Sequence, residues 1–226
     1  AFNGVLVSKF NIQPMIATLI LFTAGRSIAA WINNNELPVI SEESFGIYGG
    51  FIPGIPIPTP VFIMLVCVLL TALALKYTNL GLYTQAVGIN ASSSRLNGLN
   101  PAFIKFISFV ILGLCVAVVG LIKVSRLSSI NYSVIAKDIE MDAILAVALG
   151  GNSLSGGKFN MTASILGAYV IQFLTTTLYK FNVESAALSA YKAVVVIALV
   201  VFSAPEVRKK LAGLTKKFKP QAKEAV

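Results

Sequence analysis

Uninterrupted apolar runs limit the fold of this chain more than any other feature. Several runs reach about 18 to 21 residues, enough for a helix that rises about 1.5 Å per residue to cross a hydrocarbon core of about 30 Å. Charged residues make up only 12% of the 226 residues, against about 25% in a soluble domain. Transmembrane β-barrels need short alternating segments, which these continuous runs lack. The sequence therefore predicts an all-α, polytopic transmembrane helix bundle and excludes a soluble enzyme domain.

The apolar runs and their flanking residues divide the chain. We expect full spans at Ile12–Trp31, Pro58–Tyr77, Pro101–Ile122, Met161–Tyr179 and Ala186–Ala204. Thr59 can cap the second span, and Asn100 before Pro101 is a helix start signal. Pro205 ends the last span. The predicted domains are a transmembrane domain at 1–205 and a basic cytoplasmic tail at 206–226.

A shorter apolar stretch, Ile139–Leu149, is too short to cross alone. Its first turn is acidic, with Asp138, Glu140 and Asp142 at the end where negative charge favours the helix dipole, which predicts a half-helix. A glycine-rich run that regular helix disfavours follows it. This glycine run consists of Gly150, Gly151, Asn152, Ser153, Leu154, Ser155, Gly156, Gly157 and Lys158.

The basic residues predict how the chain is oriented. The tail carries most of its charge as Lys and Arg, which places it in the cytoplasm. If the half-helix and glycine run merely dipped into the membrane, the segment Thr78–Asn100 would lie outside and the acidic loop Glu36–Ile57 inside, against the charges. Counting Ile139–Lys158 as one broken crossing reverses both assignments, so we expect the loop Asn33–Ile57, named here the outer loop, to face outside. Irregular backbone at membrane depth needs protein or water around it, so the glycine run is a candidate translocation path or gate.

Several kinds of chemistry are excluded by what the chain lacks. It has no histidine, and Cys67 and Cys115 lie in mid-span without a CxxC pair. We expect free thiols and no catalytic residue, metal site or cofactor. The glycine run departs from a phosphate-binding loop because Phe159 follows Lys158 where a hydroxyl residue is required. The basic tail predicts a solvated end near membrane lipid rather than a nucleic-acid site.

Two further features concern helix packing. Arg26 lies within the first span, and we expect its head to snorkel to the outer interface near Trp31. Small residues spaced by four predict close helix approaches. These pairs are Gly25/Ala29, Gly113/Ala117 and Ala163/Gly167.

Two longer motifs resemble those of the permease subunits of bacterial ribose/galactose-type ABC importers, within the branched-chain amino acid/ribose permease superfamily. Residues 88–99 (GINASSSRLNGL) look like that family's cytoplasmic motif, roughly GxNxxAARLSGI. Residues 140–157 (EMDAILAVALGGNSLSGG) are similar to ELDAIAAVVLGGTSLSGG, and residues 12–19 match more weakly. Ser92–Ser94 and Lys158–Asn160 depart from the usual pattern. The resemblance covers nearly all of Gly4–Pro205 and lacks the family's first spans, so we expect the C-terminal part of a longer permease.

The resemblance implies a non-enzymatic pore subunit of an ATP-driven monosaccharide importer in the bacterial inner membrane. Its implied partners are a second permease subunit in a homo- or heterodimer, a cytoplasmic ABC ATPase and an extracytoplasmic sugar-binding protein. A short helix at about Asn90–Asn97, capped by Asn90 and stopped by Gly98, would be the coupling helix that docks on the ATPase. The implied ATPase-coupling residues are Gly88, Asn90, Arg95, Leu96, Gly98 and Leu99.

Two other functions remain open. An ABC permease for branched-chain amino acids or nucleosides shares the general design. An ion-coupled secondary transporter would need ionisable groups in mid-membrane, whereas the acids here lie near the ends of the spans.

Overall fold

The computed structural model of the chain describes residues 1–40, 43–52, 54–127, 129–132, 135–136, 138–154, 156–181, 190–191, 193–194 and 197. The predicted span at 186–204 lies largely outside these residues, and Ser155 and the tail at 206–226 lie wholly outside them. Within the described residues the fold is all-α, as predicted, with only isolated β-bridges at Val39/Ser129 and Phe51/Pro58.

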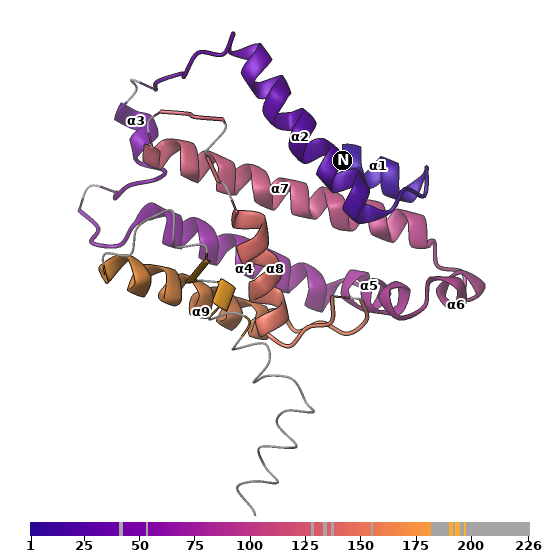
Figure 1. Cartoon of the computed structure of the whole chain (residues 1–226). Helices are drawn as coiled ribbons and strands as arrows, with labels where there is room; N and C mark the ends of the chain where they lie inside the picture. The colour runs from indigo at the N-terminus through magenta and orange to yellow at the C-terminus, as the bar shows by residue number, and fades with distance from the viewer. Residues whose placement is uncertain are drawn as a thin grey trace, which may run out of the picture. The chain divides into compact units, whose positions relative to one another are not determined.

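The chain forms two compact units. Unit 1 comprises Ala1–Lys137 with Ser155–Lys158, and unit 2 comprises Asp138–Leu154 with Phe159–Val226. Unit 1 holds α1 (Phe2–Ser8), α2 (Pro14–Ile32), α3 (Glu43–Gly46), α4 (Thr59–Tyr77), α5 (Leu80–Ile89), α6 (Ala91–Leu96) and α7 (Pro101–Leu127) (Figure 1). Unit 2 holds α8 (Ile139–Leu149) and α9 (Met161–Lys180).

Helices α2, α4, α7 and α9 are each long and apolar enough to cross a membrane, in agreement with four of the predicted spans. Only 6%, 6%, 0% and 11% of the residues in their most apolar windows are buried. Apolar surface on this scale is unfavourable in water and needs lipid or other protein to cover it.

Helix α7 runs beyond the predicted end at Ile122 to Leu127 because contacts with the outer loop support its last turns. The Ser125 hydroxyl accepts a hydrogen bond from Gly49 N at 2.8 Å and donates one to the Phe45 carbonyl. The outer loop also bonds to the segment after α7, where Ile130 N donates to the Pro38 carbonyl at 3.0 Å. The outer loop is therefore held against the C-terminal end of α7.

Arg26 has a protein partner near the same end of unit 1. Its Nη1 donates to the Tyr132 carbonyl at 3.1 Å, and its guanidinium lies 4.7 Å from the centre of the Phe22 ring. Trp31, the expected interface marker, is 79% exposed. The guanidinium of Arg26 thus donates a hydrogen bond to the backbone of the segment after α7.

The other end of unit 1 is formed by α5 and α6, with α3 at the opposite end (Figure 1). Helices α4 and α7 run between these ends, and α5 contacts both of them. Helix α1, which sequence reasoning missed, packs on α7 where a Cβ on Gly4 would lie 3.0 Å from Phe106 Cδ2. Glycine therefore permits that close approach.

One predicted cap is wrong. Helix α4 begins at Thr59 itself, with Pro58 in the N-cap position and no side-chain cap hydrogen bond. The backbone N–H of Thr59, at the first helical position, donates instead to the Gly50 carbonyl at 2.9 Å, so a contact with the outer loop holds this helix start. Its buried hydroxyl has no hydrogen-bond partner among the described residues. The predicted start signal at Asn100 is confirmed, since its Oδ1 accepts from Phe103 N at 3.2 Å.

Unit 2 is built on a close crossing of α8 and α9. A Cβ on Gly150 would lie 2.6 Å from the Ala163 carbonyl oxygen, and one on Gly167 would overlap the Ala146 carbonyl. The predicted close approach at Ala163/Gly167 is confirmed. Gly25 and Gly113 have no neighbouring atom within 4 Å of a built Cβ, so the described residues show no close approach at those positions.

Candidate functional site

The segment that matches the coupling motif has the local structure that the sequence predicts. Asn90 caps α6, with its Oδ1 accepting from Ser93 N at 3.0 Å. Gly98 adopts a φ of +79° just after the helix, and Gly98 N donates to the Arg95 carbonyl at 3.0 Å. Leu99 N bonds to the Ser94 carbonyl at 3.1 Å. This pair of bonds closes the helix C-terminus with an αL glycine.

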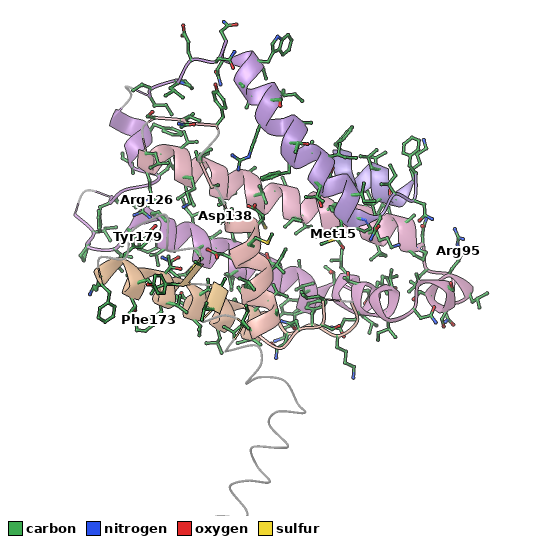
Figure 2. The ribbon with its side chains drawn as sticks, viewed as in Figure 1. Met15, Arg95, Arg126, Asp138, Phe173 and Tyr179 are labelled. Atoms are coloured by element: carbon green, nitrogen blue, oxygen red, sulfur yellow. The ribbon has the colours of Figure 1, made fainter. Side chains whose placement is uncertain are left out.

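Helix α6 buries one face and exposes the other. Ser94 is 5% exposed, and its hydroxyl donates to the Asn90 carbonyl at 2.9 Å, so its replacement of the usual alanine leaves no unpaired hydroxyl. Leu96 is 90% exposed and Arg95 is also exposed. Figure 2 shows Arg95 on α6 at the end of unit 1. An apolar side chain and a cation are therefore both exposed on this helix.

Sequence reasoning missed the helix before α6. The segment 78–89, for which no helix was predicted, contains α5, which packs on α4 and α7. Leu80, Tyr83 and Val87 share one helical face, and Val87 is 8% exposed. That spacing was the signal available in the sequence. Since α5 leads directly into Asn90, it supports the position of α6.

The half-helix begins and ends where the sequence predicts. Helix α8 starts at Ile139, with Glu140 and Asp142 in its first turn. Asp138 occupies the N-cap position with a φ of +64° and makes no side-chain cap bond. Aspartate tolerates this left-handed conformation better than most residues. Asp138 therefore acts on the helix terminus through its charge rather than through a cap bond.

The glycine run leaves helical geometry at once. Gly151, Gly156 and Gly157 have φ values of +77°, +96° and +104°, which L side chains rarely adopt. Asn152 closes the turn between α8 and α9: its Nδ2 donates to Ser164 Oγ at 2.8 Å, and its Oδ1 accepts from Asn160 N. Ser153 and Leu154 continue the turn. The described residues of the run after Gly150 thus form a non-helical link between α8 and α9.

Unit 1 brings two of the sequence-predicted segments into backbone contact. A Cβ built on Gly88, at the end of α5, would lie 2.8 Å from Gly157 N. One built on Gly156 would lie 2.9 Å from the Gly88 carbonyl oxygen. A Cβ on Gly157 would meet Ile89 Cγ1 at 3.6 Å, an ordinary van der Waals distance. The coupling segment and the end of the glycine run therefore touch, a contact that no sequence pattern predicted.

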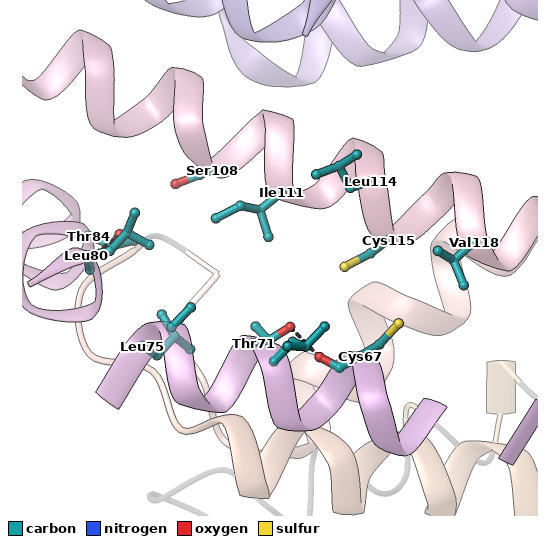
Figure 3. A pocket seen from close by; sticks show the side chains of 12 residues that line it. Cys67, Thr71, Leu75, Leu80, Thr84, Ser108, Ile111, Leu114, Cys115 and Val118 are labelled. Atoms are coloured by element: carbon teal, nitrogen blue, oxygen red, sulfur yellow. Dashed lines mark hydrogen bonds between the residues drawn. The ribbon is translucent and has the colours of Figure 1, made fainter. Parts of the chain in front are cut away.

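A cavity of about 450 Å³ lies between α4, α5 and α7 (Figure 3). Its hydroxyl groups are bonded to their own helices: Thr71 donates to the Cys67 carbonyl at 2.7 Å and Ser108 to the Ile104 carbonyl at 2.9 Å. The remaining wall is mainly apolar, and Cys67 and Cys115 line it as free thiols. A sugar needs many hydrogen-bond partners, so this cavity is not suited to hold one.

Metal ligands do not cluster in the part of the chain that the structure describes. No group of three or more His, Cys, Asp or Glu residues lies close enough there to hold an ion.

Comparison with known proteins gives evidence on the family of this chain that does not depend on the structure. Residues 1–204 match the model of a family described as the permease component of branched-chain amino acid transport systems. The chain is 37% identical over 228 residues to a fructose import permease protein of Bifidobacterium longum. It is 35% identical over 200 residues to a galactofuranose transporter permease protein, and 36% identical over 203 residues to a ribose import permease protein, both of Escherichia coli.

These matches cover most of this chain but less of the relatives. They include 98%, 88% and 88% of the chain, and 64%, 58% and 63% of the three relatives. The chain therefore spans about three fifths of the length of these curated proteins. No solved structure matches it.

Proposed function

We propose that this chain, which belongs to the family of permease components of branched-chain amino acid transport systems, forms part of the translocation path of an ATP-driven importer for a monosaccharide. The four long apolar helices and the family make it a multi-pass membrane protein. One observation carries the choice of substrate: relatives with 35–37% identity are named as fructose, galactofuranose and ribose permeases. The chain itself is a pore subunit without catalytic residues, and ATP hydrolysis belongs to a partner.

The ATPase docks on α6 in this proposal. Arg95 and Leu96 are exposed on a short helix whose buried face is anchored through Ser94. A desolvated cation paired with a carboxylate and a buried leucine are both effective contacts at an interface. The support from α5 and the cap at Asn90 make α6 a rigid element, as transmission of a displacement requires.

The chain crosses the membrane through a broken helix at 139–158. If this segment dipped and returned, Lys158 would lie inside and Gly88 outside. Gly88 and Gly157 are in backbone contact, which a bilayer core of about 30 Å between them would forbid. The contact thus supports the broken crossing, with Thr78–Asn100 and Lys158 both in the cytoplasm.

The same topology places the outer loop at 33–57 outside the membrane. The outer loop and α6 lie at opposite ends of unit 1 (Figure 1), which supports opposite sides of the bilayer. The outer loop, held against α7 through Ser125, would receive the extracytoplasmic sugar-binding protein. The basic tail at 206–226 would lie in the cytoplasm after the transmembrane domain at 1–205, and a second permease subunit would complete the pore.

The glycine run would line the translocation path or its inner gate. Gly151, Gly156 and Gly157 have positive φ values, and irregular backbone inside a membrane needs protein or water around it. Gly150 supports the close crossing of α8 and α9, whereas Gly156 and Gly157 contact the coupling segment. We expect the residues from Asn152 to Ser155 to face the path.

Transport assays test this function. The full-length permease would be expressed with the ATPase and the binding protein encoded beside it, and uptake of labelled ribose, fructose and galactose would be measured against leucine and adenosine. We expect uptake of a monosaccharide that stops when the ATPase cannot hydrolyse ATP. Uptake of leucine or adenosine alone would assign the amino acid or nucleoside class, which the family description keeps open. Uptake that persists without ATPase and stops with a protonophore would indicate ion coupling.

A further inference from the structure

We propose that Gly88, Gly156 and Gly157 form a backbone joint through which a displacement of the coupling segment moves the glycine run, an inference that rests on the proposed function. The joint makes these glycines positioning residues for transport. It would connect ATP-driven movement at α6 directly to the candidate path, without an intervening side chain.

The first observation is the closeness of the two backbones. A Cβ on Gly88 would lie 2.8 Å from Gly157 N, and a Cβ on Gly156 would lie 2.9 Å from the Gly88 carbonyl oxygen. Both neighbouring atoms belong to main chain, which cannot rotate aside as the end of a side chain can. Closely packed groups of this kind transmit a displacement with little slack.

The second observation is the rigidity on the coupling side. Gly88 lies within α5, two residues before Asn90, whose side chain caps α6. Helix α5 contacts α6, and both contact α7. A push on Arg95 or Leu96 is therefore transferred to Gly88 through backbone that two helices hold.

The third observation is how the chain divides into units. Residues Ser155–Lys158 belong to unit 1, although the residues before and after them belong to unit 2. Displacing this short segment must act on the ends of α8 and α9, because the chain connects them through only a few residues. The positive φ values of Gly156 and Gly157 explain why glycine is needed on this side as well.

Matched alanine variants of the full-length permease test the joint. Gly88→Ala places a methyl group against Gly157 N, whereas Gly113→Ala, on α7, meets nothing within 4 Å. Copurification of the ATPase, thermal stability, ATP hydrolysis and sugar uptake would be measured together. We expect Gly88→Ala to keep the ATPase bound but to lower sugar uptake per ATP by about tenfold. We expect Gly113→Ala to behave like the wild type.

A merely structural role would lower stability and copurification in parallel with uptake, without changing uptake per ATP. That result, or equal behaviour of Gly88→Ala and Gly113→Ala, would overturn the joint while leaving the importer function intact.

A cysteine pair decides the matter if Gly88→Ala does not fold. Ile89→Cys with Lys158→Cys, in a background of Cys67→Ala and Cys115→Ala, places one thiol directly after each of the two glycines in contact, at positions without a positive φ. We expect a short, reducible bifunctional thiol reagent to join the two cysteines and to stop uptake, with recovery on reduction. Absence of the cross-link, or full transport with it formed, would contradict the proposal. Since cross-linking needs no substrate, it separates failure of the joint from failure of the proposed function.

Discussion

Replacing Leu96 by alanine should weaken the ATPase interaction without destabilising the permease. Leu96 is 90% exposed on α6, so its truncation removes almost no packing within this chain. If the ATPase buries the side chain, the substitution removes three carbons from the interface, at about 0.8 kcal/mol for each buried methylene. The expected loss is about 2.4 kcal/mol, which corresponds to about a 50-fold rise in Kd.

The assay is titration of the detergent-solubilised full-length permease with the purified ATPase. Leu82→Ala is the matched control, because Leu82 is also exposed, at 67%, but lies on α5 rather than α6. We expect Leu82→Ala and the wild type to bind alike, and all three proteins to melt at the same temperature. A change in Kd below about threefold for Leu96→Ala would refute burial of this side chain by the ATPase.

Three further outcomes follow from the same geometry. Arg95→Glu should abolish ATPase copurification and sugar uptake while changing stability by less than about 0.5 kcal/mol, because Arg95 is an exposed surface charge; normal copurification would exclude it from the docking surface. Gly167→Ala should lower the melting temperature, at a cost of about 1–3 kcal/mol, because its methyl group overlaps the Ala146 carbonyl. Gly25→Ala should leave the melting temperature unchanged, because a Cβ at Gly25 has open space around it. Equal melting temperatures for the Gly167→Ala and Gly25→Ala variants would contradict the close crossing of α8 and α9. Cysteines at 152–155 should react with a water-soluble thiol reagent, and complete protection in both the resting and ATP-bound states would exclude them from the path.

The sequence predicted the elements whose signals are local. The length of the apolar runs located α2, α4, α7 and α9, because a helix that crosses the lipid core must be apolar over its whole length. Asn90 and Gly98 defined α6, and the acidic residues after Lys137 defined the start of α8. Each of these signals lies within a few residues of the structure that it specifies.

Features that depend on contacts between residues far apart in the chain could not be predicted from local sequence patterns. Thr59 was a good capping residue by type, but Pro58 takes the N-cap position and the Thr59 backbone N–H bonds to the distant Gly50 carbonyl. The last turns of α7 depend on Ser125 and its partners in the outer loop. The contact of Gly88 with Gly157 joins residues far apart in the chain, and glycine has no side chain to signal a partner.

Labelling from each side of the membrane tests most directly whether the coupling segment and the end of the glycine run face the ATPase together. Single cysteines at Arg95, Lys158 and Asn34 would be placed in full-length permease with Cys67 and Cys115 replaced by alanine. A membrane-impermeant maleimide would then be applied to inside-out and right-side-out vesicles. We expect Arg95→Cys and Lys158→Cys to be labelled only in inside-out vesicles, and Asn34→Cys only in right-side-out vesicles. Labelling of Arg95→Cys and Lys158→Cys from opposite sides would contradict the broken crossing and the coupling that depends on it.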